Sequence, residues 1–141
     1  MKQLDKNDNL THLLGLLGPS MLLRIAVGII LISHSLPGMI DGGVNAFGKY
    51  YLNEIGFAPY GVTIAWAIKI SHVICAFLLF TNRLITIACI FSIAIMVAGI
   101  VLVHFKEGWF VVGGGRNGME YNVVLIAVLL QILVNSTKKH E

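Results

Sequence analysis

Ionisable side chains stand inside the most apolar stretches of the sequence, where they could bind a ligand or move a proton. Lys69 and His72 lie within one such stretch, and their three-residue spacing puts both on one face of a helix. A charged group at membrane depth costs about 2.5–3.5 kcal/mol on insertion scales, so each is a candidate functional residue. Four further polar residues stand at the ends of the other apolar stretches: His34, His104, Glu120 and Asn122.

Three interpretations of these six residues are open. In the first, Lys69 pairs with Glu120, or with Glu54 as second choice, and polar pairing simply holds the helices together. In the second, the residues line a ligand-binding cavity. In the third they catalyse a reaction, although the sequence does not identify the catalytic residues. A histidine could donate a hydrogen bond to a quinone oxygen or relay its proton, and Lys69 could stabilise negative charge on that oxygen.

Other chemical motifs in the sequence carry less weight. The histidines and the glutamate lack the close spacing, such as H-x-x-x-H, that metal sites usually use, so we predict no metal site. Cys75 and Cys89 form no C-x-x-C motif, and we interpret both as packing residues. Residues 113–118 match G-x-G-x-x-G, but a dinucleotide site also needs a strand and a βαβ unit. We interpret this segment as a mobile loop in which Arg116 can meet an anion.

The composition places these residues in a membrane. The chain has 141 residues, of which 57% are hydrophobic and 12% charged, and its mean hydropathy is +0.83. A soluble domain usually carries about 25% charged residues, so this chain cannot cover a water-facing surface. The net charge of +3 comes from scattered Lys and Arg residues that flank apolar spans. This pattern indicates membrane insertion and gives no reason to expect a nucleic-acid partner.

Four stretches are long and apolar enough to cross a hydrocarbon core of about 30 Å. We predict an all-α fold in which residues 1–141 form one integral membrane four-helix bundle. The very short turn at 81–83 makes the second and third helices a tight antiparallel hairpin. The predicted spans cover approximately residues 19–36, 62–80, 84–104 and 119–135.

A short amphipathic helix and an aromatic-rich cap are predicted on the outer side. Nine of the 13 aromatic residues lie in the outer connections or at the helix ends there, whereas a membrane belt would place Trp and Tyr at both interfaces. A site would therefore face outward. The helix covers about residues 45–55, and Gly56 supplies its stop. Its apolar face consists of Val44, Phe47, Tyr51 and Ile55.

The distribution of Lys and Arg predicts the orientation of the bundle. The side that holds both termini and the 81–83 turn has five of these residues in its flanks, and the opposite side has three. Both termini are therefore predicted to lie in the cytoplasm. The five are Lys2, Lys6, Arg83, Lys138 and Lys139, and the three are Lys49, Lys106 and Arg116.

The order and spacing of several short motifs resemble the DoxX family of small four-helix membrane proteins. The resemblance covers roughly residues 20–134 and departs from the family at two places. Where many members carry an acidic residue fourteen positions before the arginine, this chain has Lys69, and His72 replaces a small glycine. The matching pieces are LRIAVG at 23–28, His34, NAF at 45–47, IGFAP at 55–59, Arg83, His104 and GMEYN at 118–122.

The resemblance implies a four-helix bundle in the cytoplasmic membrane of a bacterium or an archaeon. Some relatives are linked to quinone-dependent thiosulfate oxidation or to oxidative-stress complexes, others help assembly, and many have no assigned activity. We therefore expect an accessory subunit that holds a quinone-like or lipid ligand for a membrane oxidoreductase. The expected ligand-binding residues are His34, Lys69, His72, His104, Glu120 and Asn122.

The alternative is a non-catalytic membrane scaffold or assembly factor for a partner protein. In that case the polar residues specify helix packing, and the cap docks the partner. A small-solute transporter is less well supported, because the sequence has no evident internal repeat. The expected contacts of the chain are the lipid bilayer, an oxidoreductase or other membrane protein, and a second copy of itself.

Overall fold

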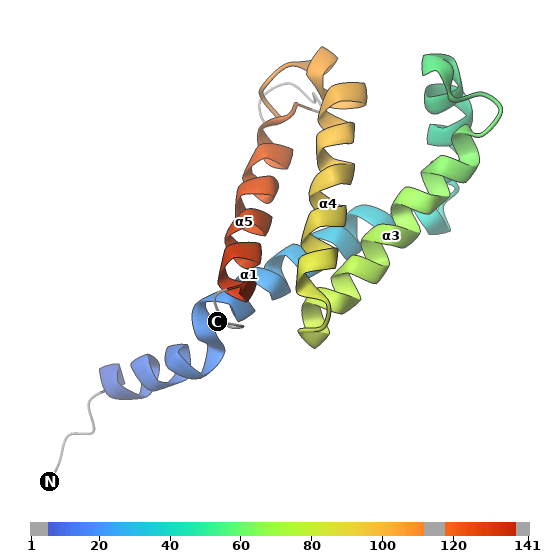
Figure 1. The fold of residues 1–141 in the computed structure, drawn as a ribbon. Helices are drawn as coiled ribbons and strands as arrows, with labels where there is room; N and C mark the ends of the chain where they lie inside the picture. Colours follow the sequence, from blue (N-terminus) through green and yellow to red (C-terminus); the bar gives the residue numbers. More distant parts are fainter. Residues whose placement is uncertain (1–5, 112–117, 138–141) are drawn as a thin grey trace, which may run out of the picture.

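Figure 1 shows the chain as a computed structural model that describes residues 6–111 and 118–137, with side chains from residue 20 onward. Every regular element within these ranges is a helix, which confirms the predicted all-α fold. Four of the helices are long and apolar enough to span a membrane. Several residues used in the predictions above lie outside the described ranges: Lys2, 112–117 of the glycine-rich loop with Arg116, Lys138 and Lys139.

Four long helices form the body of the molecule. The first, α1, is longer than predicted, because it begins well before position 19 and includes Pro19. Its N-terminal part extends away from the other helices (Figure 1), and the part of spanning length and composition is Ser20–Ile40. The four helices are α1 (Lys6–Ile40), α3 (Gly61–Thr81), α4 (Ile85–Gly99) and α5 (Glu120–Thr137).

The four helices pack in a closed ring. The α1 helix contacts α3, α3 contacts α4, α4 contacts α5, and α5 returns to α1. Cys75 and Cys89 are free thiols buried in the shared core, in agreement with their interpretation as packing residues. Van der Waals packing of this kind is a main source of helix association in membranes. The buried core consists of Val27, Leu31, Cys75, Ala76, Leu79, Ala88, Cys89, Met96, Leu125, Leu129 and Ile132.

A tight turn joins α3 to α4, as predicted. Asn82 takes a left-handed conformation with φ of 57°, which Asn tolerates better than most residues. The Arg83 N–H donates a hydrogen bond of 3.1 Å to the Leu78 carbonyl oxygen, and so pairs a carbonyl group left open at the helix end. The two helices therefore form an antiparallel hairpin.

Residues 43–57, called the cap segment here, fold as two consecutive short helices beside the N-terminal end of α3 (Figure 1). They are α2 (Gly43–Phe47) and the π-helix η1 (Gly48–Phe57). Val44 and Leu52 are buried against Ala65 of α3. The predicted apolar face is thus used in packing on α3. At the end of η1, Gly56 has a φ of 110°, in line with the predicted stop.

Two glycines bring the backbone of the cap segment against that of α3. A Cβ atom on Gly48 would overlap the backbone of Val62, and one on Gly61 would overlap the Gly48 carbonyl oxygen. Asn53 Oδ1 accepts a hydrogen bond of 2.9 Å from the Gly61 N–H, one of the donors that a helix start leaves open. The absence of a Cβ atom at both positions therefore allows the two backbones to approach this closely.

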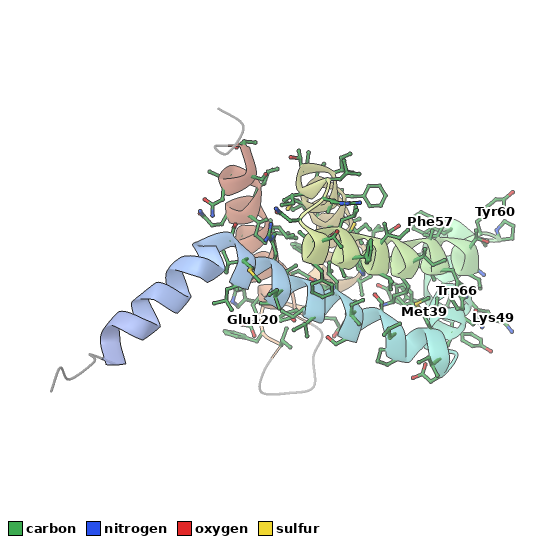
Figure 2. The ribbon with its side chains drawn as sticks, turned by 90° about the horizontal axis from the view of Figure 1, so that it is seen from below. Met39, Lys49, Phe57, Tyr60, Trp66 and Glu120 are labelled. Atoms are coloured by element: carbon green, nitrogen blue, oxygen red, sulfur yellow. The ribbon has the colours of Figure 1, made fainter. Side chains whose placement is uncertain are left out.

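A side-chain hydrogen bond adds to this attachment and gives a first prediction. The Trp66 indole N–H of α3 donates a bond of 2.8 Å to Asn45 Oδ1 of α2, and Figure 2 shows Trp66 at the cap end of the molecule. Trp66→Phe keeps an aromatic ring but removes the donor, so the free energy of unfolding should fall by about 0.5–1.5 kcal/mol. Denaturant titration in detergent micelles, followed by circular dichroism, measures the change.

The control is Trp109→Phe, because Trp109 is about half exposed, at 48%. This variant should unfold close to the wild type. Equal losses in the two variants would show that the Trp66–Asn45 bond has no particular part in stability.

Candidate ligand-binding site

A cavity of about 590 Å³ lies between the four helices and the cap segment. The volume falls within the range of about 300–1,000 Å³ that is typical of small-molecule sites. The walls also include η2 (Ile100–His104), a π-helical turn that continues α4. Large apolar side chains make up half of the lining residues: Ile30, Leu31, Val44, Phe47, Leu52, Ile68, Ile95, Met96, Leu102, Val103, Val111 and Leu125.

Five of the six residues predicted as a ligand site come together around this cavity. Glu120 is the exception, and Tyr121 is a polar lining residue that the sequence reasoning did not assign to the site. Tyr121 could have been found from its place in the first turn of α5, directly before Asn122. The polar lining consists of His34, Lys69, His72, His104, Tyr121 and Asn122.

The closest geometry within this set joins α1 to α3. The rings of His34 and His72 lie with their centroids 6.0 Å apart and their planes at 54°. Lys69 Nζ donates a hydrogen bond of 3.0 Å to the backbone carbonyl oxygen of His34. The depth of His72 within its predicted span therefore does not keep its ring away from His34. Because α1 continues to Ile40, one turn beyond its predicted end, His34 lies further inside the helix than expected.

His72 is the most buried polar side chain of the lining, with 4% of its surface exposed. Both ring nitrogens are covered, and neither has a hydrogen-bond partner in the described part of the chain. Leaving a buried polar group unpaired costs about 1–3 kcal/mol. His72 is also among the residues that line the cavity.

Glu120 has a different partner from the predicted one. Its Oε1 accepts a hydrogen bond of 2.9 Å from the Val111 N–H, and its own N–H donates one of 3.0 Å to the Trp109 carbonyl oxygen. The expected Lys69–Glu120 pair is therefore replaced by two separate hydrogen bonds. Glu120 begins α5, and the donor on its side chain is the Val111 N–H, nine residues earlier in the chain. Figure 2 shows it far from the labelled residues of the cap.

The cap segment is joined to η2 across the cavity. The Tyr51 hydroxyl group donates a hydrogen bond of 2.8 Å to the Leu102 carbonyl oxygen. The Tyr51 ring also stacks on Phe47, with centroids 5.4 Å apart. Both η1 and η2 are π-helical, a rare form that is frequent at functional sites. The cavity wall thus combines two irregular helical segments that are distant in the sequence.

The arrangement of donors suits hydrogen bonding and charge compensation. In the described ranges, no group of three or more His, Cys, Asp or Glu side chains is placed to hold a metal ion. Lys69 and His72 can instead present N–H donors to an oxygen of a bound molecule.

Comparisons with protein-family models, curated proteins and solved structures found no match to this chain. The resemblance to the DoxX family therefore rests on the motif residues alone. Six of these residues line the cavity: His34, Phe47, His104, Gly118, Tyr121 and Asn122.

Proposed function

We propose that this chain is an integral membrane protein that holds one quinone-like or lipid molecule in its cavity. The observation that carries the proposal is the buried ring of His72, which lines the cavity and has no partner in the described residues for either nitrogen. A ligand oxygen that accepts a hydrogen bond from this ring would recover the cost of burying it. Helix packing alone would be served better by an apolar residue at this position.

The lining supports an amphiphilic ligand. Apolar side chains surround most of the cavity, and polar side chains reach it from α1, α3, η2 and α5. Such walls accommodate a long apolar group and a head with hydrogen-bonding oxygens, two features that quinone-like molecules and lipids share. His72 would hold the head, and Lys69 would stabilise negative charge on its oxygen.

The cellular place and the partner follow from the charge pattern and the DoxX resemblance. We place the bundle in the cytoplasmic membrane of a bacterium or an archaeon, with both termini in the cytoplasm and the cap segment on the outer side. The protein would serve a membrane oxidoreductase as an accessory subunit that supplies or stores the ligand. That partner would provide the redox centre.

Filling the cavity tests this proposal. A Cβ atom on Gly99 would have only the His104 ring near it, at 3.8 Å, so a leucine there fits the backbone and extends along the lining. Overpacking costs about 1–3 kcal/mol, and 1.4 kcal/mol is tenfold in affinity. We expect Gly99→Leu to retain no more than about a tenth of the wild-type ligand. Native mass spectrometry of protein extracted gently from its own membrane measures the bound mass.

The matched control is Ala94→Leu, on the exposed side of the same helix. It adds a similar volume outside the described lining and should keep the full ligand load. A Gly99→Leu protein that still carries the wild-type ligand would contradict the proposal.

The scaffold function is a second candidate because several aromatic side chains in the connections between the long helices are exposed. Tyr60, Phe105 and Phe110 are each about two-thirds exposed. Docking of a partner protein would bury them, since aromatic residues are enriched at protein interfaces. Under this function Phe110→Ser would release the partner in a co-purification experiment, while Gly99→Leu would keep it.

A further inference from the structure

We infer that the head of the ligand is a single anion, as in the carboxylate of a long-chain fatty acid. The inference rests on the proposed function and names the chemistry of the ligand in the same cavity. One lysine and three histidines line it, and none of the described lining residues is acidic.

Lys69 carries the positive charge of the lining. Its ammonium group has three N–H donors, and the His34 carbonyl oxygen takes one of them at 3.0 Å. A carbonyl group is a dipole and does not neutralise a full charge. Glu120, the carboxylate expected to do so, is bonded to Val111 instead. A charge at this depth is costly without a counter-charge, and an anion bound in the cavity would provide one.

His72 indicates where the anion lies. It follows Lys69 by three residues on α3, so both side chains leave the same face of the helix. Both also line the cavity. A carboxylate has two oxygens, one of which can accept a bond from the Lys69 ammonium group and the other from a ring N–H of His72. This placement uses the donors of both residues.

The number of charges favours a monoanion. The described lining contains one lysine and no arginine, so a doubly charged head would keep one negative charge uncompensated. A neutral quinone head would leave the Lys69 charge uncompensated. The rest of the lining is largely apolar and encloses about 590 Å³, a small-molecule volume. A single-chain fatty acid has both the single negative charge and the apolar body that this lining requires.

The test compares two probes of equal chain length, palmitic acid and 1-hexadecanol, on delipidated protein in detergent. Native mass spectrometry titrations give both affinities. Wild-type protein should bind palmitate about tenfold tighter or more, because a hydrogen bond to a charged group is worth more than one between neutral groups. Lys69→Met should remove this preference, and Lys69→Arg should keep it. Lys49→Met removes an exposed lysine of the cap segment and should change neither affinity.

The outcomes separate this inference from the proposed function. Decylubiquinone, titrated in the same way, serves as a third probe with a neutral quinone head. Equal affinities for palmitate and hexadecanol in the wild type, or a preference for decylubiquinone over palmitate, would overturn the anionic head and leave a ligand-binding protein. Failure of all three probes to bind would overturn the proposed function as well. The wild-type comparison decides the question even where Lys69→Met does not fold.

Discussion

Alanine in place of Gly48 is expected to loosen the cap segment from α3 and to lower the free energy of unfolding by about 1–3 kcal/mol. The added Cβ atom overlaps the backbone of Val62, which cannot turn aside as a flexible side chain can. Because Val44 and Leu52 of the cap segment line the cavity, the same variant should retain less ligand. Thermal unfolding followed by circular dichroism and native mass spectrometry measure the two effects.

The matched control applies the same substitution where there is room. A Cβ atom on Gly99 meets nothing closer than 3.8 Å, and its helical backbone accepts alanine. Gly99→Ala should therefore be as stable as the wild type or slightly more so, since alanine favours helix over glycine by up to about 1 kcal/mol. If Gly48→Ala proves as stable as Gly99→Ala, the close contact between the cap segment and α3 does not exist.

Leucine in place of His72 is expected to stabilise the ligand-free protein and to abolish ligand retention. The substitution removes two buried nitrogen atoms that have no partner in the described residues, which should raise the free energy of unfolding by about 1–3 kcal/mol. It also removes the donor proposed to hold the ligand head. Opposite changes in stability and binding are characteristic of a residue kept for function. Denaturant titration of delipidated protein and the ligand mass measure them.

Ser92→Ala is the control for the stability effect. The Ser92 hydroxyl group is fully buried and likewise has no partner in the described residues, but Ser92 is not among the described residues of the lining. Its replacement should raise stability or leave it equal, with the ligand retained. Loss of stability in ligand-free His72→Leu would assign His72 to helix packing and favour the scaffold function.

The spans could be predicted because they depend on local properties. The stretch that forms α3 is apolar apart from Lys69, His72 and a few small polar side chains. Asn82 and Gly56 stand where a left-handed residue ends a helix. Helical periodicity likewise placed Lys69 and His72 on one face, and both line the cavity. Each of these features depends on residues that are near one another in the chain.

The partners of the polar residues could not be predicted in the same way. The approach of His34 to His72 depends on how far α1 continues and on how it packs against α3. The bond between Glu120 and Val111 joins two residues nine positions apart and occupies a carboxylate oxygen expected to pair with Lys69. Several arrangements satisfy the same charges, and the sequence does not rank them.

The sequence by itself determined that the chain has four helices of membrane-spanning length and composition and that a tight turn joins the second to the third. It also determined that Lys69 and His72 lie on one helix face. Only the tertiary structure decided that five of the six predicted site residues share one cavity and that the cap segment forms part of its wall. It also decided that Gly48 and Gly61 permit the close contact between the cap segment and α3. The physical reason is the range of the interactions. Hydropathy and helical periodicity act between neighbours in the chain, whereas a cavity is the space that remains when helices distant in sequence pack together.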